Sequence, residues 1–239
     1  MLSSGIEWQR LTLQLHNPFR LSYGVSETRT SYWLRLPEDS GWGEGTLPPY
    51  YGIDLAEVEV FWQAVVDSAR RLPDDPSEIE AWVGQVGPAP GRCALEIALY
   101  DRLARQQGQP FYRFFDLPQP SGLSTSFTIA IDSPEAMAEM ARTRPDYPVI
   151  KVKLGSEDDY TRLRAIREAR PDARLRIDAN AGWTFEETLR NIRALEVLDL
   201  EMIEQPLPKE DIEGLGRVQK ETSIQVEADD SVQTMEDIE

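Results

Sequence analysis

Apolar residues in the second half of the chain recur with two different spacings, one typical of strands and one typical of helices. Short apolar runs predict strands at 127–131, 149–154, 175–178, 200–204 and 224–229. The segments between them predict helices that begin near 134, 156, 184 and 209. This βαβα order predicts a parallel sheet, either open or closed into a barrel.

The first hundred or so residues have a more mixed pattern. Alternating apolar residues predict strands at 6–15 and 32–36, and the polar segment between them predicts a hairpin or a mobile loop. Helical spacing predicts helices at about 54–71 and 92–107. The glycines and prolines of 41–52 argue against regular structure there.

The segment 118–123 contains two prolines and a glycine and is the best candidate for a linker. We therefore expect an α/β protein with two domains, at 1–122 and 123–239.

Composition narrows the classes of function. The 239 residues are 41% hydrophobic, which supports a packed core and excludes wholesale disorder. A net charge of −17 repels phosphate backbones and anionic head groups, so neither nucleic acids nor membrane surfaces are expected partners. A single Cys and a single His exclude an internal disulfide framework and a histidine-rich zinc site. With no leader-like start and no apolar run of ~20 residues, we expect a soluble cytoplasmic protein.

Charged residues stand near the ends of the predicted strands. Lys151 and Lys153 flank a single residue, so both side chains point to the same face of their strand. Asp178, Glu204 and Asp229 end the next three strands, at intervals of 25, 26 and 25 residues (178 − 153, 204 − 178 and 229 − 204). In a parallel barrel this repeat brings successive strand ends together at the C-terminal rim. We therefore expect the three carboxylates and the two ammonium groups to converge.

Each of these residues also has a purely structural interpretation. A lone Asp at a strand end is usually a helix or turn cap, and a lysine pair more often protects an edge strand from aggregation. Independent caps do not explain the shared interval, and a strand inside a βαβ array should be apolar rather than carry two lysines. The acidic residues 157–159 and 186–187, in contrast, are expected to be solvated charges favoured by the helix dipole.

Three converging carboxylates repel one another in a poorly solvated site unless a cation offsets their charge. An all-oxygen ligand set favours Mg²⁺, with Mn²⁺ as the alternative. Two neighbouring lysines beside a dication depress each other's pKa, which leaves one amine able to act as a base near pH 7. This combination suits removal of the proton α to a carboxylate.

Four motifs, in this order and spacing, resemble the muconate-lactonizing subgroup of the enolase superfamily: Lys151-Val-Lys153, Asp178-Ala-Asn180, Glu204-Gln205-Pro206 and Ala228-Asp229-Asp230-Ser231. Within that subgroup, the segments 128–129, 178–183 and 210–215 are most similar to dipeptide epimerases of the L-Ala-D/L-Glu type. The resemblance covers essentially the whole chain. It implies an N-terminal α+β capping domain followed by a TIM-type (β/α) barrel, with about five of its strands present.

The resemblance also implies the roles of the site residues. Asp178, Glu204 and Asp229 would bind the metal, Lys153 would be one acid/base, and Lys151 would assist electrostatically. The implied substrate is a small carboxylate, with a dipeptide such as L-Ala-L-Glu as the leading class, and the loops 18–29 and 46–52 would close over it.

Several alternatives stay open. Within the superfamily they are o-succinylbenzoate synthase, muconate cycloisomerase and N-acylamino acid racemase. Outside catalysis, the chain would be a truncated relative that acts as a binding or assembly subunit. A homo-oligomer is compatible with the sequence.

Two features depart from the family pattern. Asp230 stands where the family usually has Glu, and the shorter carboxylate changes the surroundings of Asp229. The family's second catalytic lysine lies on the next strand, which is expected beyond residue 239. We therefore expect the chain to be a fragment that lacks about 85–110 residues of a closed barrel, with a shortened relative as the alternative.

Overall fold

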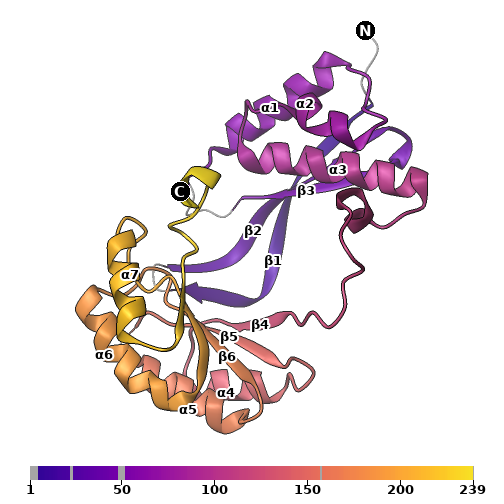
Figure 1. The fold of residues 1–239 in the computed structure, drawn as a ribbon. Helices are drawn as coiled ribbons and strands as arrows, with labels where there is room; N and C mark the ends of the chain where they lie inside the picture. The colour runs from indigo at the N-terminus through magenta and orange to yellow at the C-terminus, as the bar shows by residue number, and fades with distance from the viewer. Residues whose placement is uncertain (1–4, 22–23, 48–51, 157, 239) are drawn as a thin grey trace. The chain divides into compact units, whose positions relative to one another are not determined.

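The computed structural model describes residues 5–21, 24–47, 52–156 and 158–238, which form two compact units (Figure 1). The first unit comprises the described residues of 1–16 and 27–121, and the second comprises those of 17–26 and 122–239. Of the helices in the described part of the chain, none combines the length and the apolar character that crossing a bilayer requires.

The first unit combines a sheet with helices. Its sheet is formed by β1 (Glu7–Leu21), β2 (Gly24–Arg35) and β3 (Trp42–Thr46), in the order β1-β2-β3, and the described residues of 17–26 in β1 and β2 are counted with the second unit. β1 and β2 are hydrogen-bonded neighbours and both are longer than predicted, and residues 22–23 between them lie outside the described residues. The helices are α1 (Leu55–Ser68), α2 (Ile79–Val83) and α3 (Ala89–Gln107), with 3-10 turns at Pro37–Asp39, Pro76–Glu78 and Phe111–Phe115.

β3 overturns the expectation that 41–52 lacks regular structure. It pairs antiparallel with β2, and α3 packs directly on it. A Cβ atom on Gly43 would lie 1.9 Å from the carbonyl oxygen of Ala94 in α3, so only glycine permits this approach. The glycines therefore mark a close contact between a strand and a helix. Residues 48–51 lie outside the described residues.

Parallel strands alternate with helices in the second unit. Within the described residues, its five-stranded sheet has the order β4-β5-β6-β7-β8 and every neighbouring pair is parallel. The strands are β4 (Ser126–Ile129), β5 (Val149–Lys153), β6 (Arg174–Asp178), β7 (Leu200–Glu204) and β8 (Gln225–Glu227). The helices are α4 (Pro134–Arg142), α5 (Asp159–Ala169), α6 (Phe185–Leu195) and α7 (Ile212–Glu221), with 3-10 turns at Glu196–Leu198 and Met235–Ile238. The predicted α/β class is confirmed, with an N-terminal α+β unit followed by five parallel strands that alternate with helices.

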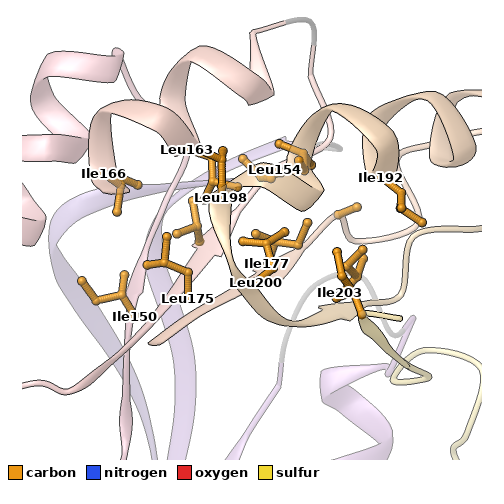
Figure 2. Packing of buried hydrophobic residues seen from close by; sticks show 14 of the residues in the cluster. Ile150, Leu154, Leu163, Ile166, Leu175, Ile177, Ile192, Leu198, Leu200 and Ile203 are labelled. Atoms are coloured by element: carbon orange, nitrogen blue, oxygen red, sulfur yellow. The ribbon is translucent and has the colours of Figure 1, made fainter. Parts of the chain in front are cut away.

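The hydrophobic core of this unit lies between the sheet and its helices. Ile150, Ile177 and Ile203, from three neighbouring strands, are completely buried. Figure 2 shows them in one cluster with side chains from the helices, among them Leu163, Ile166 and Ile192. Side chains alternate along a strand, so the residues that precede and follow each of these isoleucines in the sequence face the other side of the sheet. The core thereby fixes which face carries the charged residues.

Candidate active site

The strand register sets charged side chains of neighbouring strands side by side. Lys153 at the end of β5 is paired with Asp178 at the end of β6, and Asp178 is paired with Glu204 at the end of β7. Lys151 precedes Lys153 by two residues and shares its face. Four of the five residues singled out by the sequence therefore lie on one face of the sheet.

These lysine and carboxylate side chains are in direct contact. Lys153 Nζ lies 2.5 Å from Asp178 Oδ2, and Lys151 Nζ lies 2.9 Å from the same oxygen. Lys151 Nζ also contacts Glu204, at 2.7 Å from Oε1 and 2.6 Å from Oε2. The Asp178 side chain is completely buried and Lys153 is 8% exposed. Ammonium groups thus neutralise carboxylates that could not stay buried alone.

Burial and neighbouring charge act against each other on the pKa values of this group. Burial, helped by the Asp178 carboxylate and opposed by Lys151, raises the pKa of Glu204 to about 7. Burial also acts to raise the pKa of Asp178, but Lys153 and Lys151 outweigh it and hold that pKa below its usual value.

Lys151 responds in the opposite sense to the sequence-based expectation. Burial acts to lower its pKa, but the contacts with Glu204 and Asp178 prevail and raise it. The expected lowering comes from the neighbouring lysine and from a dication beside the amine, whereas here the ammonium is in contact with two carboxylates. Lys151 therefore stays charged while it holds these two side chains.

Asp229 lies beyond the end of its strand. β8 ends at Glu227, so it is shorter than predicted, and Glu227 is the residue in register with Glu204. Among the described residues, no three His, Cys, Asp or Glu side chains are arranged to hold a metal ion. The structure brings Asp178 and Glu204 together and leaves Asp229 on the segment that follows β8.

The expectation that Asp159 is a solvated charge is wrong. Asp159 is only 4% exposed. Its Oδ2 accepts hydrogen bonds from the backbone N–H of Gly155 at 2.9 Å and from Nε1 of Trp183 at 3.1 Å. Asp159 thereby ties the loop after β5 to the loop after β6. Its partner Trp183 is 24 residues away, so the acidic run itself gives no signal of this contact.

Gln205 has no assigned role in the sequence analysis beyond its place in a motif. It is completely buried, and its side-chain amide bonds to the segment that carries Asp229. The sequence feature that could have indicated a role for Gln205 is its position between Glu204 and Pro206, where a polar residue directly follows the charged residue at the end of a strand.

The placement of Asp178 and Glu204 fits a divalent cation. Their oxygens converge from neighbouring strands on a single positive charge, the ammonium of Lys151. Carboxylate oxygens are the ligands that Mg²⁺ prefers, and a dication could bind both carboxylates in place of the Lys151 ammonium. Burial and the charges of Asp229 and Asp178 raise the pKa of Asp230, a further acidic group near this face. The arrangement can hold a cation next to an amine that carries a proton.

The chain resembles known proteins in both sequence and fold. Residues 135–239 match the family described as "Enolase C-terminal domain-like". Among curated proteins, the L-Ala-D/L-Glu epimerase of Bacillus subtilis (strain 168) is 32% identical, over 96% of this chain and 67% of that protein. Four curated relatives match the chain over 53% to 70% of their own length, so the chain spans only part of these proteins.

Solved structures resemble the chain over nearly its whole length. The dipeptide epimerase of Enterococcus faecalis V583, in complex with Mg and the dipeptide L-Leu-L-Tyr, has a TM-score of 0.86 and 27% identity, over 99% of this chain and 70% of that one. The N-succinyl Arg/Lys racemase of Bacillus cereus ATCC 14579 has a TM-score of 0.87 and 25% identity, over 98% of this chain and 67% of that one.

Proposed function

Because the chain belongs to the enolase-like family, in the branch that contains the dipeptide epimerases, we propose that it removes and returns the proton α to a substrate carboxylate with the help of Mg²⁺. The strongest support is the position of Lys153, whose Nζ is held at the carboxyl end of β5 against the buried Asp178. Active sites of parallel barrels lie at this end of the strands.

The side chains divide into ligands and proton carriers. Asp178, Glu204 and Asp229 would hold Mg²⁺ through carboxylate oxygens, and Mn²⁺ would suit the same oxygens. Bound Mg²⁺ supplies positive charge that stabilises the negative charge developing on the substrate carboxylate as the α proton leaves.

Lys153 is the residue that would move the proton. Its Nζ, as the neutral amine, would accept the α proton and return it as the ammonium. Lys151 would add fixed positive charge beside the substrate carboxylate. Return to the original face regenerates the substrate, so epimerisation also requires proton delivery to the opposite face.

The leading substrate class is a dipeptide. The Enterococcus faecalis structure holds a dipeptide together with Mg, and the Bacillus subtilis relative is named for L-Ala-D/L-Glu. The likeness in fold to an N-succinyl Arg/Lys racemase supports N-acylated amino acids as the second class. Both classes present a carboxylate with an adjacent α proton, as the proposed chemistry requires.

Exchange of the α proton with solvent tests this function directly. The chain is incubated in D₂O and Mg²⁺ with an L,L-dipeptide library and, separately, with N-succinyl amino acids, and deuterium at the α carbon is followed by mass spectrometry. We expect exchange that EDTA abolishes and that is lost in the variant Lys153→Met. Absence of exchange with both substrate classes would contradict the function and favour a non-catalytic binding role. Exchange that survives EDTA would contradict the metal.

A further inference from the structure

Gln205 connects three consecutive strand ends. Its side-chain Oε1 accepts hydrogen bonds from the backbone N–H of Asp229 at 2.9 Å and of Ser231 at 3.2 Å. Its Nε2 donates to Ser231 Oγ at 2.8 Å and to the carbonyl oxygen of Leu207 at 2.9 Å. Both ends of the amide are thus engaged, in a side chain that is completely buried.

The backbone of Gln205 reaches the strands on either side. Its carbonyl oxygen accepts from the N–H of Ala181 at 2.8 Å, in the loop after β6. Its N–H donates to the carbonyl oxygen of Glu227 at 2.8 Å, at the end of β8. Gln205 therefore bonds to the segments that follow Asp178 and precede Asp229, while it is itself the neighbour of Glu204.

The backbone conformation of Gln205 is one that a residue with a side chain rarely adopts. Its φ is +37°, in the left-handed region that glycine adopts most readily. A residue with a side chain persists in such a conformation only where the surrounding contacts fix it, and such residues cluster at functional sites. Here those contacts are the two hydrogen bonds of its backbone and the four of its side-chain amide.

We propose that Gln205 is a positioning residue that holds the Asp229–Ser231 segment in place, so that Asp229 can join Asp178 and Glu204 around one metal ion. This inference rests on the proposed function. Residues 229–231 follow the end of β8. The Oε1 atom of Gln205 accepts hydrogen bonds from the backbone N–H groups of Asp229 and Ser231, as a neighbouring strand would within a sheet. Removing groups that orient metal ligands typically weakens metal binding 10- to 100-fold.

Gln219 offers a matched control. It lies on α7, and its amide also bonds to the backbone around β8: Nε2 donates to the carbonyl oxygen of Ile224 at 3.1 Å and Oε1 accepts from the N–H of Val226 at 2.8 Å. These bonds hold the start of β8 rather than the segment after it. A loss of amide bonds at Gln219 therefore perturbs the same strand without touching Asp229.

The test compares Gln205→Met with Gln219→Met, because methionine is close in size to glutamine but lacks the amide. Hydrogen exchange of the metal-free chain, read by mass spectrometry, should show faster exchange at 229–231 in Gln205→Met only. Titration calorimetry with Mg²⁺ should show binding roughly 10- to 100-fold weaker in Gln205→Met and changed less than about twofold in Gln219→Met. Equal Mg²⁺ affinity in Gln205→Met and the unaltered chain would overturn the inference, as would equal losses in the two variants.

A second variant covers the case in which Gln205→Met does not fold. Ser231→Ala removes the hydroxyl that accepts from Gln205 Nε2 and donates to the Lys209 carbonyl oxygen at 2.9 Å. We then expect Mg²⁺ affinity to fall by a few-fold, and an unchanged affinity would overturn the inference. An unaltered chain that binds no Mg²⁺ would overturn the metal-dependent function, and this inference with it. A Gln205→Met chain that binds Mg²⁺ as tightly as the unaltered chain would overturn this inference and leave the proposed function standing.

Discussion

The ammonium of Lys151 contacts both carboxylate oxygens of Glu204, at 2.7 and 2.6 Å. In the proposed site this ammonium competes with Mg²⁺ for the same oxygens. We expect Lys151→Met to bind Mg²⁺ roughly five- to tenfold more tightly, equal to about 1 kcal/mol of relieved repulsion, and to lose α-proton exchange. Titration calorimetry measures the first effect. Lys220→Met, on an exposed position of α7, is the control and should match the unaltered chain. Weaker Mg²⁺ binding in Lys151→Met would contradict this account.

Lys153→Met should separate catalysis from folding. The exchange rate should fall by roughly 10²- to 10⁴-fold, as expected when a positioned acid/base is lost. The free energy of unfolding should fall by about 1–3 kcal/mol, because Asp178 stays buried with Lys151 as its partner. Denaturant unfolding and deuterium incorporation give the two numbers. A variant that is stable and still exchanges at the original rate would remove Lys153 from the mechanism.

The raised pKa of Glu204 predicts how the stability of the metal-free chain depends on pH. Its pKa of about 7 lies above the ordinary value of 4.5, so the folded chain holds this proton more tightly than the unfolded chain. Its contribution to stability is complete below pH 4.5 and is lost as the pH rises through 7. The lowered pKa of Asp178 acts with the opposite sign, below 3.8 and outside this window.

Denaturant titrations in EDTA at about pH 5 and about pH 8 measure this effect. The unfolding midpoint should fall between the two conditions, and Glu204→Gln should reduce the fall because an amide does not titrate. An identical fall in both proteins would assign the pH dependence to other groups.

The core beneath the site should be sensitive to the loss of single methyl groups. Ile177 is completely buried in the cluster of Figure 2, so Ile177→Val should cost about 0.5–1.5 kcal/mol and Ile177→Ala about 2–5 kcal/mol. Val197, which is 75% exposed, is the control, and Val197→Ala should change the free energy of unfolding by less than about 0.5 kcal/mol. Equal costs at the two positions would show that Ile177 is not packed as described.

Local sequence patterns predict the strands and helices of the second unit well. β5 and β7 match their predicted bounds to within a residue, because alternating apolar positions next to a helical repeat leave few other arrangements. The same alternation places Lys151 and Lys153 on one face. The spacing along the chain then predicts that Asp178 and Glu204 lie at neighbouring strand ends, because the interval between them corresponds to one strand and one helix.

The features that the sequence does not predict all depend on a partner far along the chain. β3 forms where glycines indicate a turn, because α3 covers it so closely that a side chain would not fit. Asp159 is buried through its bond to Trp183, and Gln205 is engaged by a segment 24 residues later. Neither a glycine nor an acidic run specifies such a partner, so local pattern alone cannot distinguish these cases.

The alternation along β5 limits how this site can change during evolution. Val152 lies in the buried cluster, and the lysines on either side of it lie on the charged face. Inserting or deleting one residue in the strand would turn both lysines towards the helices and expose the apolar side chains. Changes of length are therefore confined to the loops that follow the strands, so new substrates can be reached by remodelling those loops while the proton-transfer residues stay fixed.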